Sequence, residues 1–371
     1  MKLLVVDHNA VDPLQQGTYR HLAETFDITT RVIAPALWHD NYRLRRVEAR
    51  SLSQTCDLVP LPVLFATRTH RHWYRGLARQ VKEFAPDVLY VNAEPENFQT
   101  FQCAALAGRR PLVFSTWRNI DHANVGYPYR LSSLHAAIER SVLRRARHGV
   151  AFTQSAADIF IGRGYNRITV IPPEVDTELF HQVSRQDHEQ FTVGYAGRLE
   201  AGKGVDILLD AVAHLPPEVR LVIIGSGRDE RRLKERSEAL GIARRVEFRA
   251  PVARRDMPQQ YGSMDVLVLP SRSGRFWREQ YGRVLIEAMA CGVPVIGSDS
   301  GEIPQVVGDA GLIFQEGNSG ELRDALDRLR NDASLRVELA RRGREVVMRR
   351  NSLERAVEAY GQLFMRVAAE T

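Results

Sequence analysis

Cysteine is rare in this 371-residue sequence, and long apolar runs are absent from it. Its three cysteines, Cys56, Cys103 and Cys291, lie far apart, with neither the spacing of a metal site nor that of a redox pair. We therefore expect buried, reduced thiols. No apolar run approaches the roughly 20 residues that a membrane-spanning helix needs. The opening run of residues 1–6 is too short for a signal peptide, so we expect a soluble, cytoplasmic protein.

Lysine is also rare, since only four of the 51 basic residues are Lys. The formal net charge of +6 is uneven, because residues 1–150 hold 20 basic and 13 acidic side chains. Two interpretations stay open: a solvated arginine-rich surface, or one that attracts an anionic acceptor or docks peripherally on the inner face of a membrane. No nucleic-acid motif accompanies the charge, so nucleic acid is not an expected partner. The clusters are Arg43, Arg45, Arg46 and Arg50, then Arg68, Arg71, Arg75, Arg79 and Lys82.

Short apolar runs alternate with stretches of helical periodicity along both halves of the chain. This alternation predicts an α/β fold with two Rossmann-like, doubly wound domains. Ligands of such sheets bind beyond the carboxyl ends of the strands, so we expect the site there, in a cleft between the domains. The polar residues 181–190 are the expected linker. From residue 320 onward the chain is expected to be helical, with Gly343 as the one internal break.

The stretch from Glu279 to Gly297 carries the strongest functional signal. Gly282 opens a run of good helix formers, which places Glu279 just before a helix start and Glu287 inside the helix. The free N–H groups of a helix start bind anions such as phosphate. With a hydroxyl-binding carboxylate on each side, the pattern suits a nucleotide sugar. A lone Glu in a helix is more often a solvated surface residue, and only the complete string favours a site.

The turn from Gly197 to Gly204 offers a second anion site. It presents Arg198 and Lys203, and its glycines allow close approach of the backbone to a ligand. Lys203 is informative because lysine is so rare in this chain. The phosphate-loop spacing G-x-x-x-x-G-K-[ST] is missing, which argues against an ATPase. There is neither a D-x-D pair nor a His/Cys cluster with ligand spacing, so no metal is expected.

Together these strings resemble the family 4 retaining glycosyltransferases of the GT-B type. The second half matches almost end to end, and the first half matches more thinly. In the second half the matching strings are Gly197-Arg198-Leu199, Lys203-Gly204, Ile224 to Gly227, Pro270-Ser271, Trp277 to Ile296, Ser298 to Pro304 and Asp309 to Gly311. In the first half they are Glu94 to Glu96, Thr116 to Asn119, Val170 to Pro172, Val175-Asp176 and Phe180.

The resemblance implies an N-terminal acceptor-side domain over residues 1–180 and a donor domain over residues 181–350. It implies a C-terminal helix within residues 351–371 that returns to the first domain. The implied activity is transfer of a hexose from a UDP- or GDP-linked sugar to a hydroxyl of a glycan, glycolipid or other glycoconjugate. Transfer would retain the anomeric configuration, need no metal, and occur on the face that the leaving group vacates.

The resemblance also implies roles for individual residues. Arg198 and Lys203 would bind the donor diphosphate and neutralise the charge that develops on it. Glu279 would hold sugar hydroxyls and steady the positive anomeric carbon, and Glu287 would accept hydrogen bonds from the ribose. Further donor contacts are implied for Gly197, Gly225, Val252, Gly282 and Arg283.

On the acceptor side the chain departs from the family pattern. The loop from Asp7 to Gly17 lacks the paired glycines of many relatives, and Thr116 to Asn119 stand where a His is usual. Acceptor-side candidates are Glu94, Glu96 and Asn119, because they follow predicted strands. Two alternatives stay open: a nucleotide-sugar epimerase on the same fold, and a non-catalytic nucleotide-sugar-binding protein.

Overall fold

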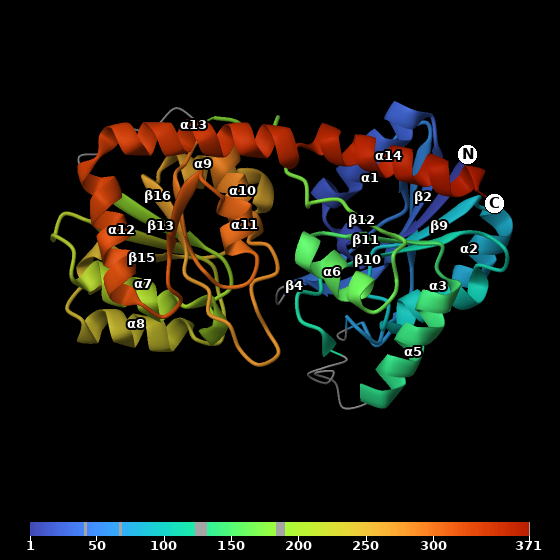
Figure 1. Cartoon of the computed structure of the whole chain (residues 1–371), viewed down its shortest axis with the longest axis horizontal. Helices are drawn as coiled ribbons and strands as arrows, with labels where there is room; N and C mark the ends of the chain where they lie inside the picture. Colours follow the sequence, from blue (N-terminus) through green and yellow to red (C-terminus); the bar gives the residue numbers. More distant parts are fainter. Residues whose placement is uncertain (41–42, 67–68, 123–131, 183–189, 371) are drawn as a thin grey trace. The chain divides into compact units, whose positions relative to one another are not determined.

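The chain forms two compact units in a computed structural model (Figure 1). Unit 1 comprises residues 1–172 and 353–371, and unit 2 comprises residues 173–352. None of the described helices combines the length and apolar character that a membrane crossing requires. Residues 183–189 of the expected linker lie outside the described part of the chain. The described residues are 1–40, 43–66, 69–122, 132–182 and 190–370.

Unit 1 is built on one large sheet with the strand order β12-β11-β10-β9-β1-β2-β6-β5 among the described residues. All neighbouring strands pair in parallel except β5, which is antiparallel to β6. The predicted doubly wound sheet is therefore confirmed for this half. The strands are β1 (Lys2–Val6), β2 (Thr29–Pro35), β5 (Arg50–Ser51), β6 (Cys56–Leu61), β9 (Val88–Val91), β10 (Leu112–Thr116), β11 (His148–Ala151) and β12 (Ile168–Val170).

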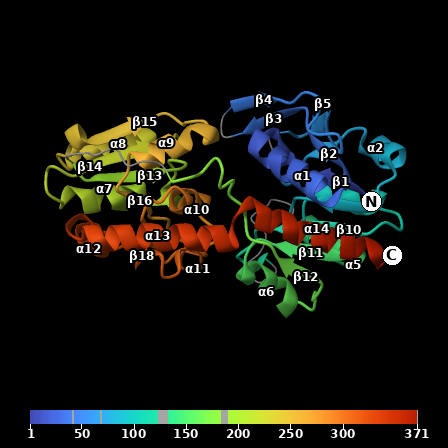
Figure 2. The same cartoon turned by 90° about the horizontal axis from the view of Figure 1, so that it is seen from above.

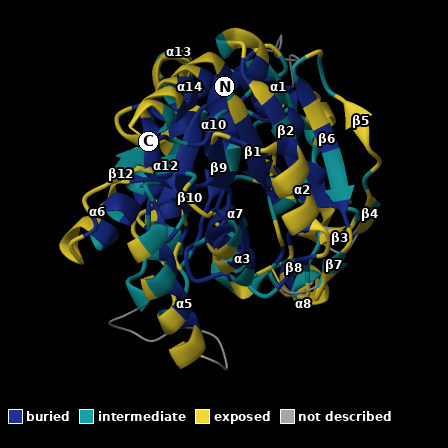
Figure 3. Cartoon of the chain, turned by 90° about the vertical axis from the view of Figure 1, so that its right-hand side faces the viewer, coloured by how far each residue is buried: buried dark blue, intermediate teal, exposed yellow. Residues whose placement is uncertain are grey.

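Both faces of this sheet are buried, which is why its strands are continuous apolar runs. Along β1, Leu3 and Val5 pack into one core while Leu4 and Val6 pack into another, as the alternation of a strand requires. Figure 3 shows the central strands buried and the exposed residues on the outer faces of the helices. One face is covered by α1 (Pro13–Phe26) and α14 (Leu353–Ala369), the other by α2 (Leu77–Phe84), α3 (Phe98–Leu106), α5 (Ser132–Arg145) and α6 (Gln154–Gly162).

The C-terminal helix α14 lies beside α1 on the sheet of unit 1 (Figures 1 and 2). Its Tyr360 and Phe364 rings pack on Tyr90 of β9, with centroid distances of 5.8 and 5.3 Å. Gly361 faces the ring of Phe26, where a Cβ atom would lie only 2.1 Å from a ring carbon. The expectation that the C-terminal helix returns to the first domain is therefore confirmed.

Two antiparallel hairpins occupy the part of unit 1 whose sequence periodicity is weakest. Trp38 from the first hairpin packs edge-on against His72, which directly precedes the second strand of the other hairpin, with centroids 5.0 Å apart. Leu44 on the outer side is 61% exposed. Arg45 and Arg46 of the first basic cluster lie on β4, and Arg75 of the second follows β8. The strands are β3 (Leu37–Asp40), β4 (Arg43–Arg46), β7 (Val63–Leu64) and β8 (Trp73–Tyr74).

Unit 2 contains a second parallel sheet with the order β15-β14-β13-β16-β17-β18 among the described residues. The second predicted Rossmann-like domain is thus confirmed. Its strands are β13 (Thr192–Ala196), β14 (Arg220–Ile224), β15 (Val246–Arg249), β16 (Val266–Leu269), β17 (Val295–Ser298) and β18 (Gly311–Phe314). Its helices are α7 (Val205–Ala213), α8 (Glu230–Ala239), α9 (Met257–Gly262), α10 (Arg283–Ala290), α11 (Ile303–Val307), α12 (Ser319–Asn331) and α13 (Ala333–Arg350).

The helical C-terminal region does not break at Gly343, so that prediction is wrong. Gly343 lies inside α13, where a Cβ atom would be 3.1 Å from the side chain of Met289 on α10. The glycine therefore allows two helices to pack closely. The helices end instead at Asp332 and Asn351. Asp332 accepts a hydrogen bond from the N–H of Leu335 and so caps the start of α13.

Candidate active site

The candidate donor site lies at the point in unit 2 where the strand order reverses. From β13 the chain proceeds outward through β14 and β15 on one side, and through β16, β17 and β18 on the other. In open α/β sheets ligands bind beyond the carboxyl ends of the strands at such a switch point, which is where the loops that leave β13 and β16 lie. Lys203, in the short helix Ala201–Lys203, follows β13, and Glu279 follows β16.

Glu279 is held by two donors from these loops. Its Oε2 accepts hydrogen bonds from Lys203 Nζ at 2.6 Å and from Ser271 Oγ at 2.7 Å. The residue is only 7% exposed, and its backbone carbonyl accepts a hydrogen bond from the N–H of Glu302. Because Ser271 is fully buried, the carboxylate is fixed in orientation. The structure thus brings together Glu279 and Lys203, which the sequence placed in two separate motifs.

An aromatic ring also supports Lys203. Its Nζ lies 5.0 Å from the ring centroid of Trp277, which is within range of a cation–π interaction. A Cβ atom at Gly202 would be 3.1 Å from the same ring, so the backbone of the turn packs directly on the indole. The ammonium group is therefore anchored by Trp277 and Glu279 in a fixed place.

The side chain of Arg198 is less constrained by its neighbours than that of Lys203. Its side chain is 48% exposed, and its ion pair with Glu200 is long at 3.3 Å. The Tyr195 hydroxyl donates a hydrogen bond to the Arg198 carbonyl at 2.8 Å, which holds the backbone of the turn. Close by, Gly225 has φ +152°, and a Cβ atom there would lie 1.9 Å from the carbonyl oxygen of Gly197. The two strand ends therefore present bare backbone, to which an anion has close access.

The second carboxylate, Glu287, lies inside α10. Its Oε1 accepts a hydrogen bond from Arg254 Nε at 2.8 Å, and its Oε2 accepts one from Tyr261 at 2.9 Å. A carboxylate offers about four lone-pair sites, so each oxygen keeps capacity for a ligand hydroxyl. No side chain caps the start of α10, where Gly282 has φ +81° and Arg283 begins the helix. Val252 is half-buried in the loop after β15.

Three residues that bind the two carboxylates were not assigned a role in the sequence analysis. Ser271 directly follows β16 in a string that matches the family, so its position at a strand end was an available signal. Arg254 and Tyr261 lie 33 and 26 residues before Glu287 in the chain. No local spacing connects them to that carboxylate; tertiary packing brings Arg254, in the short helix Arg254–Asp256, and Tyr261, on α9, to Glu287 on α10.

In unit 1, Glu94 lies just beyond β9 and is half-buried. One of its oxygens accepts from the Thr116 hydroxyl at 2.6 Å, and the other accepts from the N–H of Trp117 at 2.6 Å. Burial raises the pKa of Glu94 to about 7, and the nearby charge of Glu96 adds to the increase. The carboxyl group therefore gains and loses its proton close to neutral pH.

Glu96 and Arg118 belong to a fully buried cluster of charges. Arg118 is bound to Glu96 and, at 3.0 Å, to Glu139, which also pairs with Arg163 at 2.5 Å. Burial alone would raise the pKa of Glu96, but the guanidinium of Arg118 outweighs it and lowers that pKa to about 2. Such buried pairs are costly to break. The third candidate, Asn119, is half-buried beyond the end of β10.

The raised pKa of Glu94 predicts a pH-dependent effect of Glu94→Gln on stability. The folded chain holds this proton up to about pH 7, whereas the ordinary pKa of a glutamate carboxyl group is 4.5. Between these values folding takes up a proton, so the free energy of unfolding falls as pH rises. Glutamine does not titrate, so the variant does not show this fall in the free energy of unfolding. We expect its stability relative to the native chain to increase by about 1–2 kcal/mol from pH 5 to pH 8.

Urea unfolding at both pH values measures this difference. Glu83→Gln is the matched control, because Glu83 is an exposed carboxylate of unit 1 in a surface pair with Arg79. Parallel pH profiles for the native chain and the Glu94 variant would contradict the expectation.

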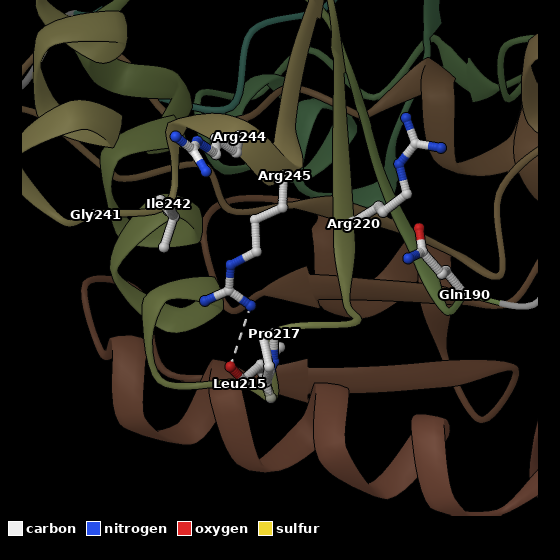
Figure 4. Close-up of a pocket in the computed structure, with 8 residues that line it drawn as sticks. All are labelled: Gln190, Leu215, Pro217, Arg220, Gly241, Ile242, Arg244 and Arg245. Carbon is white, nitrogen blue, oxygen red and sulfur yellow. Dashed lines mark hydrogen bonds between the residues drawn. The ribbon is translucent and has the colours of Figure 1, made fainter.

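A cavity of about 540 Å³ lies elsewhere in unit 2 (Figure 4). Its walls include Arg220 and Arg245, which begin β14 and precede β15, so it lies at the amino edge of the sheet. The side chains of these two residues and Arg244 point in different directions. Arg245 is engaged by backbone carbonyls, among them that of Pro216 at 2.8 Å. The cavity therefore shows no convergent binding groups.

Within the described residues no group of three or more His, Cys, Asp or Glu side chains is arranged to hold a metal ion. At the switch point, Lys203 and Arg198 are the described cationic side chains to which the sequence assigned a role in binding the diphosphate.

Two family models match the chain. The model of the group 1 glycosyl transferases matches residues 176–346, and that of glycosyltransferase family 4 matches residues 19–179. A D-inositol 3-phosphate glycosyltransferase of Stackebrandtia nassauensis is 31% identical over 228 residues, or 54% of this chain and 50% of that protein. One from Mycobacterium marinum is 36% identical over 156 residues, or 38% and 32%. The chain thus spans about half the length, or less, of these curated relatives.

Solved structures agree on the fold. Sucrose-phosphate synthase from Thermosynechococcus elongatus is 18% identical, with a TM-score of 0.77 over 100% of both chains. HepE from Anabaena in complex with UDP-glucose is 20% identical, with a TM-score of 0.73 over 99% of this chain and 100% of that one. With its two Rossmann-like sheets, its returning C-terminal helix and these matches, the chain belongs to the group 1, family 4 glycosyltransferases and has the GT-B fold.

Proposed function

We propose that this chain transfers a hexose from a nucleotide sugar to a hydroxyl group of an acceptor, with retention at the anomeric carbon and without a metal ion. The observation that carries the proposal is the 2.6 Å contact between Lys203 Nζ and Glu279 Oε2 at the strand switch point. This pair offers a cation to a diphosphate and a carboxylate to sugar hydroxyls within one hydrogen-bond length of each other.

The reaction breaks the bond between the anomeric carbon and the diphosphate oxygen. Negative charge develops on that oxygen, where Lys203 and Arg198 neutralise it. Positive charge develops on the anomeric carbon, where the carboxylate of Glu279 steadies it. The acceptor oxygen bonds to the same face as the leaving group departs, and its proton passes to the diphosphate oxygen there. Two carboxylates flanking the bond, as in glycoside hydrolases, are not needed.

A uridine donor has the best support. HepE, which shares the fold, is described in complex with UDP and with UDP-glucose. In this chain Glu287 is oriented by Arg254 and Tyr261, which suits a carboxylate that accepts hydrogen bonds from both ribose hydroxyls. The base would lie near Val252. A GDP-linked sugar is the alternative that the experiment below separates.

Thermal unfolding with UDP, GDP, ADP, UDP-glucose and GDP-mannose tests the donor. A ligand at 100 times its dissociation constant stabilises the native state by about 2.7 kcal/mol, so the correct nucleotide is expected to raise the melting temperature. Release of nucleoside diphosphate is then measured with and without a panel of hydroxyl acceptors, and activity is expected to survive EDTA. Isomerised donor sugar without acceptor would identify an epimerase. Tight donor binding with no release under any acceptor would identify a binding protein.

A further inference from the structure

At the carboxyl edge of the sheet in unit 1, an aromatic ring is only partly covered. Trp117 directly follows β10, and its indole stacks on Phe152, which directly follows β11. The ring centroids are 3.9 Å apart and the planes differ by 26°. Phe152 is buried, whereas Trp117 is half-buried. Since Phe152 stacks on one face of the indole and Trp117 is only half-buried, part of the ring is accessible to a ligand.

A carboxyl group is fixed beside this ring. Glu94 Oε1 accepts the hydrogen bond from the backbone N–H of Trp117 itself, at 2.6 Å. Its other oxygen accepts from Thr116. Both donors belong to the protein, and the half-buried carboxyl group keeps lone pairs for the donors of a ligand. With a pKa of about 7, it both accepts and donates hydrogen bonds near neutral pH.

The loop that carries Trp117 is anchored by its next residue. Arg118, the next residue after Trp117, is buried and bound to Glu96 and Glu139. Its guanidinium carbon also lies 5.2 Å from the ring centroid of Phe160 on α6. These contacts hold the residue that follows Trp117, and the hydrogen bond from the Trp117 N–H to Glu94 joins the carboxyl group to the same loop, so both groups are positioned before any ligand binds.

We propose that Trp117 and Glu94 form the binding site for an uncharged sugar ring of the acceptor, whose C–H face stacks on the indole while its hydroxyl groups bond to the carboxyl group. The proposal rests on the proposed transferase function and names its acceptor class. The π face of an indole is electron-rich and attracts the weakly positive C–H groups of a pyranose. A few fixed polar groups beside an apolar platform then give orientation and specificity.

The local charges favour an uncharged ring over a phosphorylated one. Glu94 itself would repel a phosphate when ionised. The cation that acts most strongly on it is Arg118, and that guanidinium is already bound by two carboxylates. Arg163 is likewise paired with Glu139. Among the described residues, these paired arginines offer no convergent cations beside Trp117 to an inositol phosphate, the substrate class named for the curated relatives, whereas a neutral sugar needs none.

Saturation-transfer NMR of the full chain tests this site without any donor. The probes are methyl glucoside, methyl galactoside, maltose, cellobiose, lactose and, as the charged comparison, inositol 3-phosphate. At least one neutral sugar is expected to bind. Trp117→Ala is expected to weaken its binding at least 10-fold, Trp117→Phe less, and Glu94→Gln about 3- to 10-fold. Trp73→Ala is the matched control, because Trp73 is a half-buried indole of unit 1 in a separate cavity.

Each outcome either supports or overturns the proposed sugar site. Binding that disappears in Trp117→Ala and persists in Trp73→Ala supports the site. No neutral sugar binding, unchanged binding in Trp117→Ala and Trp117→Phe, or Trp117-dependent binding of inositol 3-phosphate alone would each overturn it. The melting shift with UDP is measured on every variant and is expected to stay unchanged. If UDP does not raise the melting temperature of the native chain, the donor proposal is refuted. The NMR measurement uses no donor, so it still decides the sugar site.

Discussion

Replacing Glu279 with glutamine is expected to lower the rate of sugar transfer about 1,000-fold while the chain stays folded. The carboxylate accepts hydrogen bonds from Lys203 and Ser271 on one oxygen. An amide of the same shape places either a neutral oxygen or an NH₂ group opposite the ammonium. In both cases the negative charge that steadies the positive anomeric carbon is gone. The loss is therefore expected mainly in kcat, because this interaction strengthens as the bond to the leaving group breaks.

Steady-state release of nucleoside diphosphate with the accepted sugar measures the effect, and donor affinity comes from the melting shift. Glu247→Gln is the control, since Glu247 is an arginine-paired carboxylate on β15 of the same unit. We expect that control to turn over normally. Turnover of the Glu279 variant within 10-fold of the native chain would contradict the role of this carboxylate and, with it, the proposed mechanism.

Much of the fold could be predicted because it depends on local signals. Strands buried on both faces are continuous apolar runs, and these alternate with helical periodicity in both halves. The two hairpins of residues 37–46 and 63–74 could not be predicted in this way. Their strands are short, and their inner side chains are stabilised by a tertiary contact between Trp38 and His72. The prediction of a helix break at Gly343 failed for a related reason, because its packing partner Met289 lies far away in sequence.

The geometry of the candidate donor site was predictable to the same degree. Glu279 and Lys203 were proposed from motifs that each lie within one loop, and the strand order then brings the two loops together. The contacts of the second carboxylate depend on tertiary packing of the short helix Arg254–Asp256 and of α9 near α10, which no local spacing records. On the acceptor side, Glu94 and Glu96 are two residues apart and were indistinguishable in sequence. Their surroundings separate them, because Arg118 binds Glu96, whereas Glu94 lies beside the half-buried Trp117.

Lys203→Ala is expected to weaken binding of the nucleoside diphosphate and to lower kcat/KM about 100- to 1,000-fold. The ammonium group is the fixed cation of the site, since Arg198 is half exposed and has only a long ion pair. Its removal takes away the better-anchored of the two cations proposed to neutralise the charge that develops on the leaving diphosphate. It also removes one hydrogen-bond donor from the Glu279 carboxylate, to which Ser271 continues to donate.

The chain contains a close match for this variant. Lys234 on α8 pairs with Glu230 at 2.7 Å and lies 5.5 Å from the ring centroid of Phe248, just as Lys203 pairs with Glu279 and lies over Trp277. Lys234→Ala therefore removes the same two kinds of contact, but from a surface helix. Calorimetric titration with UDP and kinetics of transfer are expected to show normal values for Lys234→Ala and large losses for Lys203→Ala. Equal effects in the two variants would mean that loss of the contacts alone explains the result, and Lys203 would then have no part in binding the diphosphate.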